Sequence, residues 1–220
     1  MNTALVTGAT SGFGRAIALR LAALGYNLVV TGRRKELLDT LLHEINQKYS
    51  VEVFALNLDV RDKNACENAL NSLPEALRKI DLLVNNAGLA AGAAPFRESD
   101  TEDLERMIDT NVKGLLDITK LIVPGMIERN KGHIVNISSI AGIEVYPTGN
   151  VYCASKHAVN AITKGLRIDL VKHGIRVSSI SPGMAETEFS VVRYHGDREK
   201  AKAVYKGLQP LTAEDIADAL

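Results

Sequence analysis

Short apolar stretches rich in β-branched residues alternate with longer segments of helical period along the whole chain. Strands are predicted where the β-branched residues gather, at residues 4–7, 27–31, 51–58, 82–85, 133–138 and 175–181. Strands that alternate with helices are typical of repeated β-α-β units, whose sheet is mostly parallel and covered by helices on both faces. Because no linker interrupts the pattern, we expect one doubly wound α/β domain over residues 1–220.

The helical segments also indicate where helices end and which side they bury. Gly25 and Gly174 stand just before predicted strands, and we expect each to end a helix in the left-handed conformation. Pro124-Gly125 interrupts the pattern over residues 114–129 and predicts a kink or a split there. An earlier helix should face the sheet with the apolar stripe Leu37, Leu38, Leu41, Leu42 and Ile45.

The last residues of the sequence look like the beginning of a helix. Residues 212–220 open with a pattern typical of a capping box and continue for barely two helical turns. A doubly wound domain of this kind usually closes its sheet with one more strand, and nothing after Leu220 supplies it. We therefore expect that a C-terminal strand is missing from this sequence.

Composition narrows the class of partner. The chain has 26 basic and 26 acidic side chains, so it lacks the charge surplus expected of a protein that binds nucleic acid or an anionic membrane. The N-terminus shows no secretion signal, and the longest apolar stretches are about five residues, too short to cross a bilayer. Cys66 and Cys153 are widely spaced, which indicates neither a disulfide framework nor a metal site. We expect a cytoplasmic protein that binds a small molecule.

A glycine-rich turn stands between the first predicted strand and the first predicted helix, and reads Thr7-Gly8-Ala9-Thr10-Ser11-Gly12-Phe13-Gly14. Glycine permits positive φ and lets the backbone approach a diphosphate closely, while the helix N-terminus stabilises negative charge. A tight turn uses glycine anyway, but the strand before this turn and the helix after it favour a Rossmann-type dinucleotide site. The residues expected to bind the dinucleotide here are Gly8, Thr10, Ser11, Gly12, Phe13 and Gly14.

The end of the second predicted strand indicates which dinucleotide is bound. A site for NAD usually has a carboxylate there for the adenosine ribose, whereas this chain has Arg33 and Arg34. Guanidinium groups bind a phosphate monoester well, and an acidic side chain would repel it. The pattern therefore favours NADP, although the two arginines could instead only solvate a loop.

Tyr152 and Lys156 are four residues apart in a segment of helical period that runs to about His173. This spacing puts the phenol and the ammonium on one face of a helix. A nearby cation stabilises a phenolate and would bring the pKa of the tyrosine toward neutral pH, where it could exchange protons. An exposed tyrosine and lysine at this spacing are also common on helices, so the pair alone does not decide between the two interpretations.

Together with other motifs, these features make the chain resemble the short-chain dehydrogenase/reductase family over essentially its whole length. The glycine turn is similar to the family motif TGxxxGxG, Asn85-Asn86-Ala87-Gly88 is similar to its NNAG motif, and Pro182-Gly183 with Thr187 resembles its later cofactor segment. Its catalytic tetrad is matched by Asn111, Ser139, Tyr152 and Lys156. Residues 32–34, 58–61 and 188–197 look like those of NADP-dependent 3-hydroxy acid dehydrogenases acting on serine and L-allo-threonine.

The resemblance implies a role for each matching residue. Ser139 would bind the substrate oxygen, with Ser138 as the weaker alternative. Tyr152 would transfer the proton and contact both the substrate and the cofactor. Lys156 would lower the pKa of the tyrosine and hold the nicotinamide ribose, while Asn111 would position a water that relays the proton. The remaining cofactor contacts implied by the resemblance are Asp59, Val60, Asn86, Ala87, Gly88, Pro182, Gly183 and Thr187.

The segment after the sixth predicted strand bears on the substrate. We expect residues 184–197 to form a mobile lid over the nicotinamide, in which Arg193 could bind a substrate carboxylate or could only be a surface residue. Tyr146 would line the same pocket or only pack against it. The resemblance also implies a homodimer or homotetramer that packs through helices at residues 114–129 and 152–171.

These features predict an NADP-dependent oxidoreductase acting on a small 3-hydroxy acid such as serine, L-allo-threonine or 3-hydroxypropionate. Two alternatives stay open at this point. One is a reductase of neutral ketones or dicarbonyls, and the other is a protein that binds NADP as a sensor or scaffold without turnover. No metal takes part in any of them, because the five histidines show no spacing typical of a metal site.

Overall fold

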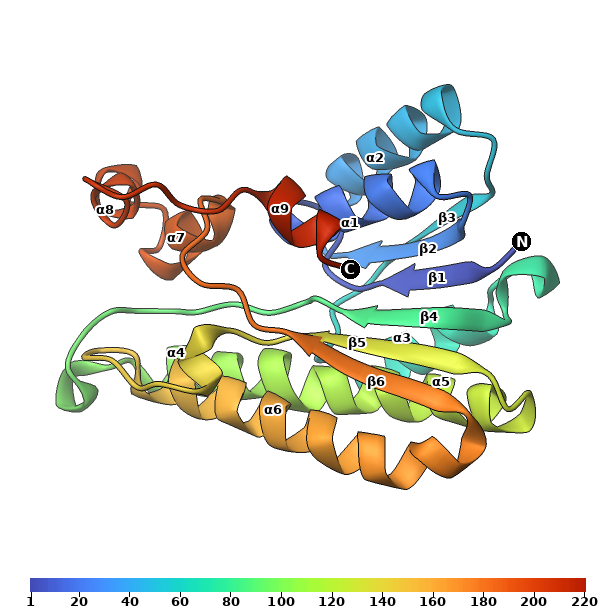
Figure 1. Ribbon diagram of the computed structural model, residues 1–220. Coiled ribbons are helices and arrows are strands. Elements are labelled where there is room, and N and C mark those ends of the chain that lie inside the picture. Colours follow the sequence, from blue (N-terminus) through green and yellow to red (C-terminus); the bar gives the residue numbers. More distant parts are fainter.

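The computed structural model describes residues 1–220 and contains one six-stranded sheet in which every pair of neighbouring strands is parallel (Figure 1). The strand order is β3-β2-β1-β4-β5-β6. The strands are β1 (Thr3–Val6), β2 (Asn27–Gly32), β3 (Val53–Asn57), β4 (Ile80–Asn85), β5 (Gly132–Ile137) and β6 (Ile175–Ile180). The predicted doubly wound α/β fold is confirmed, and the third strand is shorter at both ends than the pattern indicated.

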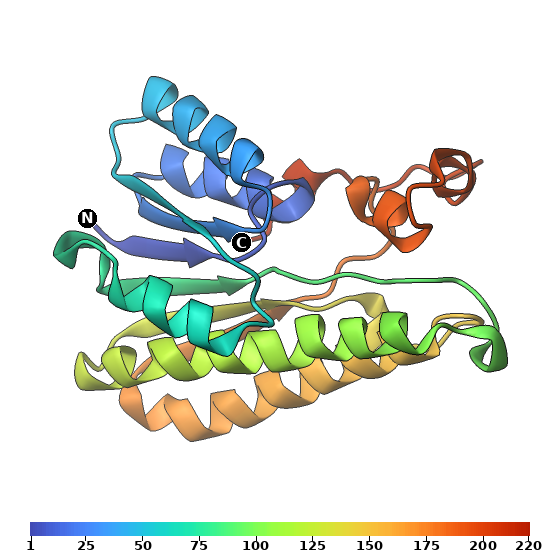
Figure 2. The same ribbon diagram turned by 180° about the vertical axis from the view of Figure 1, so that it is seen from behind.

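Helices cover both faces of this sheet (Figures 1 and 2). One side carries α1 (Gly12–Ala23), α2 (Lys35–Lys48) and α9 (Ala213–Asp218), and the other carries α3 (Lys63–Asn71), α5 (Leu115–Glu128) and α6 (Asn150–Leu170). A separate hydrophobic core lies under each layer. Every residue of β1 and β2 is buried, as expected for parallel strands enclosed on both faces.

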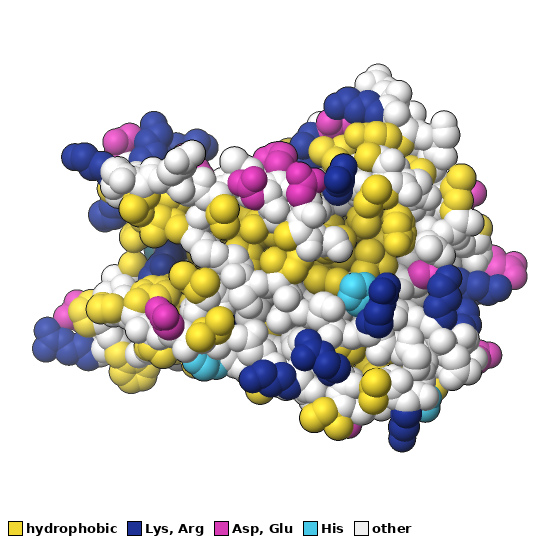
Figure 3. All heavy atoms as spheres, in the orientation of Figure 1, with side chains coloured by type: hydrophobic (Ala, Val, Ile, Leu, Met, Phe, Trp, Pro, Cys, Tyr) yellow, Lys and Arg dark blue, Asp and Glu magenta, His cyan; other side chains and the backbone are white.

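Three shorter helices lie at one end of the sheet, where the site is found. They are α4 (Thr101–Ile108), α7 (Glu188–Arg193) and α8 (Arg198–Ala203). No helix of the chain is both long enough and apolar enough to cross a membrane. Figure 3 shows the surface hollowed between the part formed by α7 and α8 and the body of the protein.

Glycines end helices where the sequence indicated. Gly25 has a φ of 82° after α1, and Gly174 has a φ of 67° after the short 3₁₀ turn Val171–His173 that continues α6. A Cβ at Gly174 would lie 2.9 Å from the carbonyl oxygen of Asn130, so space as well as conformation favours glycine there. The capping box at Thr212 is also confirmed.

Two local expectations need correction. α5 continues through Pro124, so of the predicted kink or split the split is wrong, because proline removes only one hydrogen bond of the helix and Ile118 and Met126 hold both halves in the core. The stripe on α2 is narrower than predicted. Leu38, Leu41 and Ile45 are buried, whereas Leu37 is 37% exposed, since it points about 100° away from Leu38 around the helix axis.

Candidate active site

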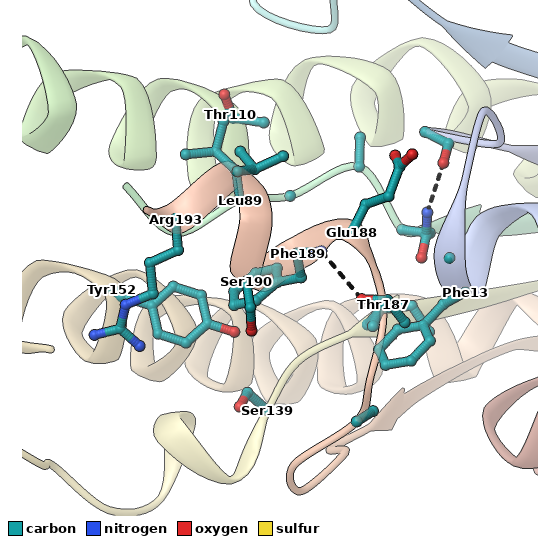
Figure 4. A pocket seen from close by; sticks show the side chains of 18 of the residues that line it. Phe13, Leu89, Thr110, Ser139, Tyr152, Thr187, Glu188, Phe189, Ser190 and Arg193 are labelled. Carbon is teal, nitrogen blue, oxygen red and sulfur yellow. Dashed lines mark hydrogen bonds between the residues drawn. The ribbon is translucent and has the colours of Figure 1, made fainter. Parts of the chain in front are cut away.

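A cavity of about 750 Å³ opens at the carboxyl ends of the strands. It lies where the strand order reverses, between β1 and β4, which is the usual ligand position in an open parallel sheet. It extends from the glycine turn at one end to Tyr152 and Arg193 at the other (Figure 4). All the site residues predicted from the sequence line it except Gly14 and Asn111.

The glycine turn has the geometry of a diphosphate cradle. Gly8 and Gly12 have φ values of 68° and 50°, which glycine adopts without strain. Ser11 occupies the N-cap of α1, yet its side chain makes no capping hydrogen bond, so the first N–H groups of the helix stay available to an anion. Gly14 lies behind this surface, where a Cβ would collide with the carbonyl oxygen of Gly8 and the amide of Asn86. Gly14 therefore serves close packing and does not contact the cavity.

Replacing Gly14 with alanine should damage the turn from behind. The added methyl group has no space, and such overpacking costs about 1–3 kcal/mol of stability. We expect a lower Tm and weaker dinucleotide binding, measured by thermal unfolding and by titration. Gly165→Ala is the matched control, because a Cβ there meets nothing within 4 Å and alanine favours a helix. Equal Tm values for the two variants would contradict this account of Gly14.

The guanidinium of Arg34 lies at the rim of the cavity among polar groups. It donates to the hydroxyl of Ser11 at 2.8 Å and to that of Thr10 at 3.1 Å, and it pairs with the carboxylate of Glu188 at 2.9 Å. This set of donors fits the phosphate monoester of NADP, because it combines a cation with two hydroxyls. Glu188 was not among the predicted site residues, since nothing in its local sequence indicates a contact with α2.

Arg33 lies beside Arg34 and faces the end of β3. Its Nη1 is 3.8 Å from a carboxylate oxygen of Asp59, which Arg61 also binds at 2.7 Å. Burial of Asp59 opposes ionisation, but the hydrogen bonds from Arg61 outweigh it and lower the pKa of the carboxyl. The predicted contact of Asp59 and Val60 with adenine stays a prediction.

Tyr152 lies near the start of α6 and points into the cavity. It is 8% exposed, and its ring centroid is 5.5 Å from that of Phe189 in α7. Burial raises the pKa of Tyr152 above its ordinary value, while hydrogen bonding to Ser139 acts in the opposite direction. The phenol is therefore protonated at neutral pH in this structure.

Lys156 lies one helical turn beyond Tyr152, but its ammonium does not reach the phenol oxygen. Nζ is 5.9 Å from the centroid of the Tyr152 ring and donates to the carbonyl oxygen of Ile137 at 2.9 Å. Burial lowers the pKa of Lys156 to about 8. Burial dominates the pKa of Tyr152 in this structure, and Lys156 does not contribute to its shift, so the expected effect of this lysine on the tyrosine stays a prediction.

Ser138 and Ser139 have different surroundings. Ser138 is 3% exposed and donates to the carbonyl oxygen of Lys156 at 3.4 Å. Both serines line the cavity, and the hydroxyl of Ser139 accepts a hydrogen bond from the backbone of Ala141 at 3.1 Å. Since only Ser139 is placed to hydrogen-bond Tyr152, the geometry favours it for binding the substrate oxygen.

Asn111 lies in a π-helical segment, Asp109–Gly114, between α4 and α5. Its Nδ2 donates to the carbonyl oxygen of Leu89 at 2.8 Å and to Ser155 at 3.0 Å, and its Oδ1 accepts from the backbone of Leu89 at 2.8 Å. The side chain thus ties the loop after β4 to α6 and does not face the cavity. Its part in a proton relay stays a prediction.

Asn86, in the loop after β4, supports the glycine turn directly. Its amide nitrogen donates to the carbonyl oxygens of Thr7 at 2.8 Å and Gly8 at 3.1 Å. Ala87 and Gly88 follow it along the cavity wall. Asn86 therefore holds the turn in place, and the predicted contact of these residues with the adenosine ribose stays a prediction.

Arg193 and Tyr146 come together from distant parts of the chain. Nη1 of Arg193 donates to the hydroxyl of Tyr146 at 3.0 Å, and its guanidinium carbon lies 5.4 Å from the centre of that ring. Nε of Arg193 also donates to the carbonyl oxygen of Gly92 at 3.3 Å. Both side chains line the cavity, and Figure 4 shows Arg193 near the ring of Tyr152. The predicted contact of Arg193 with a substrate carboxylate stays a prediction.

Further residues that hold the lid were missed by sequence reasoning. The hydroxyl of Tyr205 lies 2.6 Å from that of Ser190 and donates to the carbonyl oxygen of Ala185 at 3.0 Å. At the far end of the lid, His195 lies 2.9 Å from the carboxylate of Asp103. These pairs join segments that are separate in sequence, so no local motif could have indicated them.

Comparison with known proteins agrees with this geometry. The family described as short chain dehydrogenase matches residues 2–197. A sulfoacetaldehyde reductase of Chromohalobacter salexigens is 48% identical over 98% of this chain and 85% of its own, and a serine 3-dehydrogenase of Agrobacterium fabrum is 46% identical over 99% and 86%. The closed form of a serine dehydrogenase with NADP+ has a TM-score of 0.93 at 46% identity, covering 99% of this chain and 86% of that one. This chain belongs to the short-chain dehydrogenase family.

Proposed function

We propose that this protein is an NADP-dependent oxidoreductase that interconverts the CH–OH group of a small 3-hydroxy acid and the corresponding carbonyl. One observation carries the proposal: a single cavity joins a phosphate-binding rim at Arg34 to a tyrosine and a serine beside a second cation, Arg193. An NADP-dependent 3-hydroxy acid dehydrogenase of Salmonella typhi, 48% identical over 98% of this chain, supports the same reading.

The residues of the cavity divide the chemistry between them. NADP(H), when bound, supplies or accepts the hydride. Tyr152 gives its proton to the substrate oxygen in reduction and takes it back in oxidation, and Ser139 holds that oxygen by a hydrogen bond. The ammonium of Lys156 would hold the nicotinamide ribose. Asn111 links the loop after β4 to α6 through hydrogen bonds to Leu89 and Ser155. Because burial raises the pKa of Tyr152, reduction is favoured at neutral pH and oxidation at higher pH.

The acidic group of the substrate is assigned to Arg193. A guanidinium next to the proton-transferring tyrosine binds a carboxylate or a sulfonate by charge-assisted hydrogen bonds. The relatives are named for serine, 3-hydroxy acids and sulfoacetaldehyde, and each of these compounds carries an acidic group close to the reacting carbon. Tyr146 would orient the guanidinium.

A substrate panel tests the proposed function. We expect NADPH to form from NADP+ with L-serine, L-allo-threonine or 3-hydroxypropionate, and much less product with NAD+. A neutral diketone with NADPH tests the alternative reductase, which would turn it over faster than the acids. Binding of NADP+ without turnover of any compound would favour the sensor or scaffold instead.

We also propose that the protein acts in the cytoplasm as a homodimer or homotetramer. Both cysteines are free and buried, which suits a reducing compartment. Leu116 on α5 and Ile168 on α6 are large hydrophobic residues that are 41% and 76% exposed, and they lie on the two helices expected to pack between subunits.

A further inference from the structure

The carboxylate of Glu188 occupies an anion site at the rim of the cavity. One carboxylate oxygen lies 2.9 Å from Nη1 of Arg34, and the hydroxyl of Ser11 also hydrogen-bonds this side chain. The other terminal nitrogen of Arg34 donates to Ser11 at 2.8 Å and to Thr10 at 3.1 Å. Glu188 is thus held by the same cation and hydroxyl that the proposed function assigns to the phosphate monoester of NADP.

Glu188 carries a negative charge in this position. Burial opposes ionisation of the carboxyl, but the hydrogen bonds from Arg34 and Ser11 outweigh it and lower the pKa of Glu188. A carboxylate and a phosphate monoester require the same donors, and two anions at one site repel each other. The two anions therefore compete for Arg34, and each weakens the binding of the other.

The ion pair also joins the two sides of the cleft. Arg34 stands at the N-cap of α2, whereas Glu188 is the first residue of the lid helix α7. Thr187, directly before it, packs against the glycine turn, since a Cβ at Gly12 would lie 3.4 Å from the Cβ of Thr187. Figure 4 shows Thr187 near Phe13 of the turn. Arg34, the proposed ligand of the NADP phosphate monoester, therefore also holds the first residue of the lid helix.

We propose that Glu188 sets the cofactor specificity of this protein: its carboxylate occupies the Arg34–Ser11 site until the phosphate monoester of NADP(H) displaces it. NAD(H) has a ribose hydroxyl in place of that phosphate and leaves the pair intact. Glu188 therefore weakens the binding of NADP(H) and hardly affects that of NAD(H). This inference rests on the proposed function, because it takes Arg34 as a phosphate ligand.

Whether loss of Glu188 strengthens or weakens the binding of NADP+ distinguishes a carboxylate that competes with the phosphate from one that only holds the lid closed. If the pair stayed closed over bound cofactor as a clasp, its loss would weaken the binding of NADP+. If the carboxylate competes, its loss strengthens that binding. The side chains of Arg34 and Glu188 are 45% and 53% exposed, so solvent limits the gain. From the size of exposed ion pairs and the removal of a like charge, we expect the affinity for NADP+ to increase about two- to tenfold.

The experiment measures the Kd of NADP+ and of NAD+ by calorimetric titration of the wild type and of Glu188→Gln, with Tm measured to confirm folding. Glu186→Gln is the matched control, because Glu186 is an exposed acidic residue in the same segment and makes no ion pair. Arg34→Ala and the double variant with Glu188→Gln complete a double-mutant cycle.

We expect Glu188→Gln to bind NADP+ more tightly with NAD+ unchanged, Glu186→Gln to match the wild type, and the gain to vanish in the Arg34→Ala background. Unchanged or weaker binding of NADP+ by Glu188→Gln would overturn the inference, as would an equal gain for NAD+ or a gain that persists without Arg34. A wild type that binds NADP+ no more tightly than NAD+ would instead overturn the proposed cofactor, and this inference with it.

Discussion

Replacing Tyr152 with phenylalanine is expected to reduce kcat by about 10²- to 10⁴-fold, the usual contribution of general acid-base catalysis. The Tyr152 phenol lies beside Ser139, where it can exchange a proton with a substrate oxygen. Phenylalanine lacks this hydroxyl and keeps the ring that packs against Phe189. The Kd of NADP+ should change little, because the phosphate-binding rim lies at the other end of the cavity. Absorbance of NADPH under substrate saturation measures the effect on kcat.

Two controls make this result specific to proton transfer. Tyr26→Phe removes a hydroxyl from a tyrosine that packs against the core and does not line the cavity, and it should leave kcat unchanged. In the wild type, the oxidation rate should rise as pH increases, because burial raises the pKa of Tyr152 and oxidation requires its ionised form. If Tyr152→Phe kept more than a tenth of the wild-type kcat, another group would have to transfer the proton.

Replacing Arg193 with alanine is expected to raise KM for acidic substrates by about ten- to one-hundredfold. A hydrogen bond to a charged group contributes about 1.5–3 kcal/mol, and each 1.4 kcal/mol is a factor of ten. A neutral diketone has no acidic group to lose, so its KM should change by less than about threefold on the same reasoning. Steady-state kinetics with L-serine, 3-hydroxypropionate and the diketone measure this difference.

The observed contacts of Arg193 require a second comparison, because this side chain also holds Gly92 and Tyr146. Tyr146→Phe removes the contact with the tyrosine hydroxyl and keeps the cation, so KM for acids should rise less than with Arg193→Ala. Arg198→Ala removes an exposed positive charge nearby that does not line the cavity, and it should behave like the wild type. An equal loss for acids and for the diketone in Arg193→Ala would show that the arginine only fastens the lid.

The fold followed from the chain pattern to a large extent. Alternating apolar and helical segments predicted all six strands, because parallel strands enclosed on both faces leave a strong hydrophobic signal in the sequence. At Pro124 the split that the sequence offered beside a kink did not occur, since a missing hydrogen bond is visible in the sequence and the packing of Ile118 and Met126 that compensates for it is not. The exposure of Leu37 was likewise set by how α2 lies on the sheet.

Within the site, the sequence was informative where neighbours in the chain are neighbours in space. The glycine turn is one continuous segment, and the Tyr152–Lys156 spacing places both side chains on one helical face. The sequence could not predict that the pKa of Tyr152 is raised, because Phe189 and other residues that bury the phenol belong to a lid that is distant in sequence. The same holds for the lysine, whose ammonium contacts Ile137 on β5.

Motif and period, read along the chain, were sufficient to predict the parallel α/β fold, the glycine turn after the first strand and the placement of Tyr152 and Lys156 in one helix. These properties depend on backbone conformation and on short-range spacing, which adjacent residues specify. Packing was needed to bring Glu188 to Arg34, Tyr146 to Arg193 and Ser139 to Tyr152. Contacts between distant segments, and the burial that shifts a pKa, arise when helices and lid close on the sheet, so no local stretch of sequence contains them.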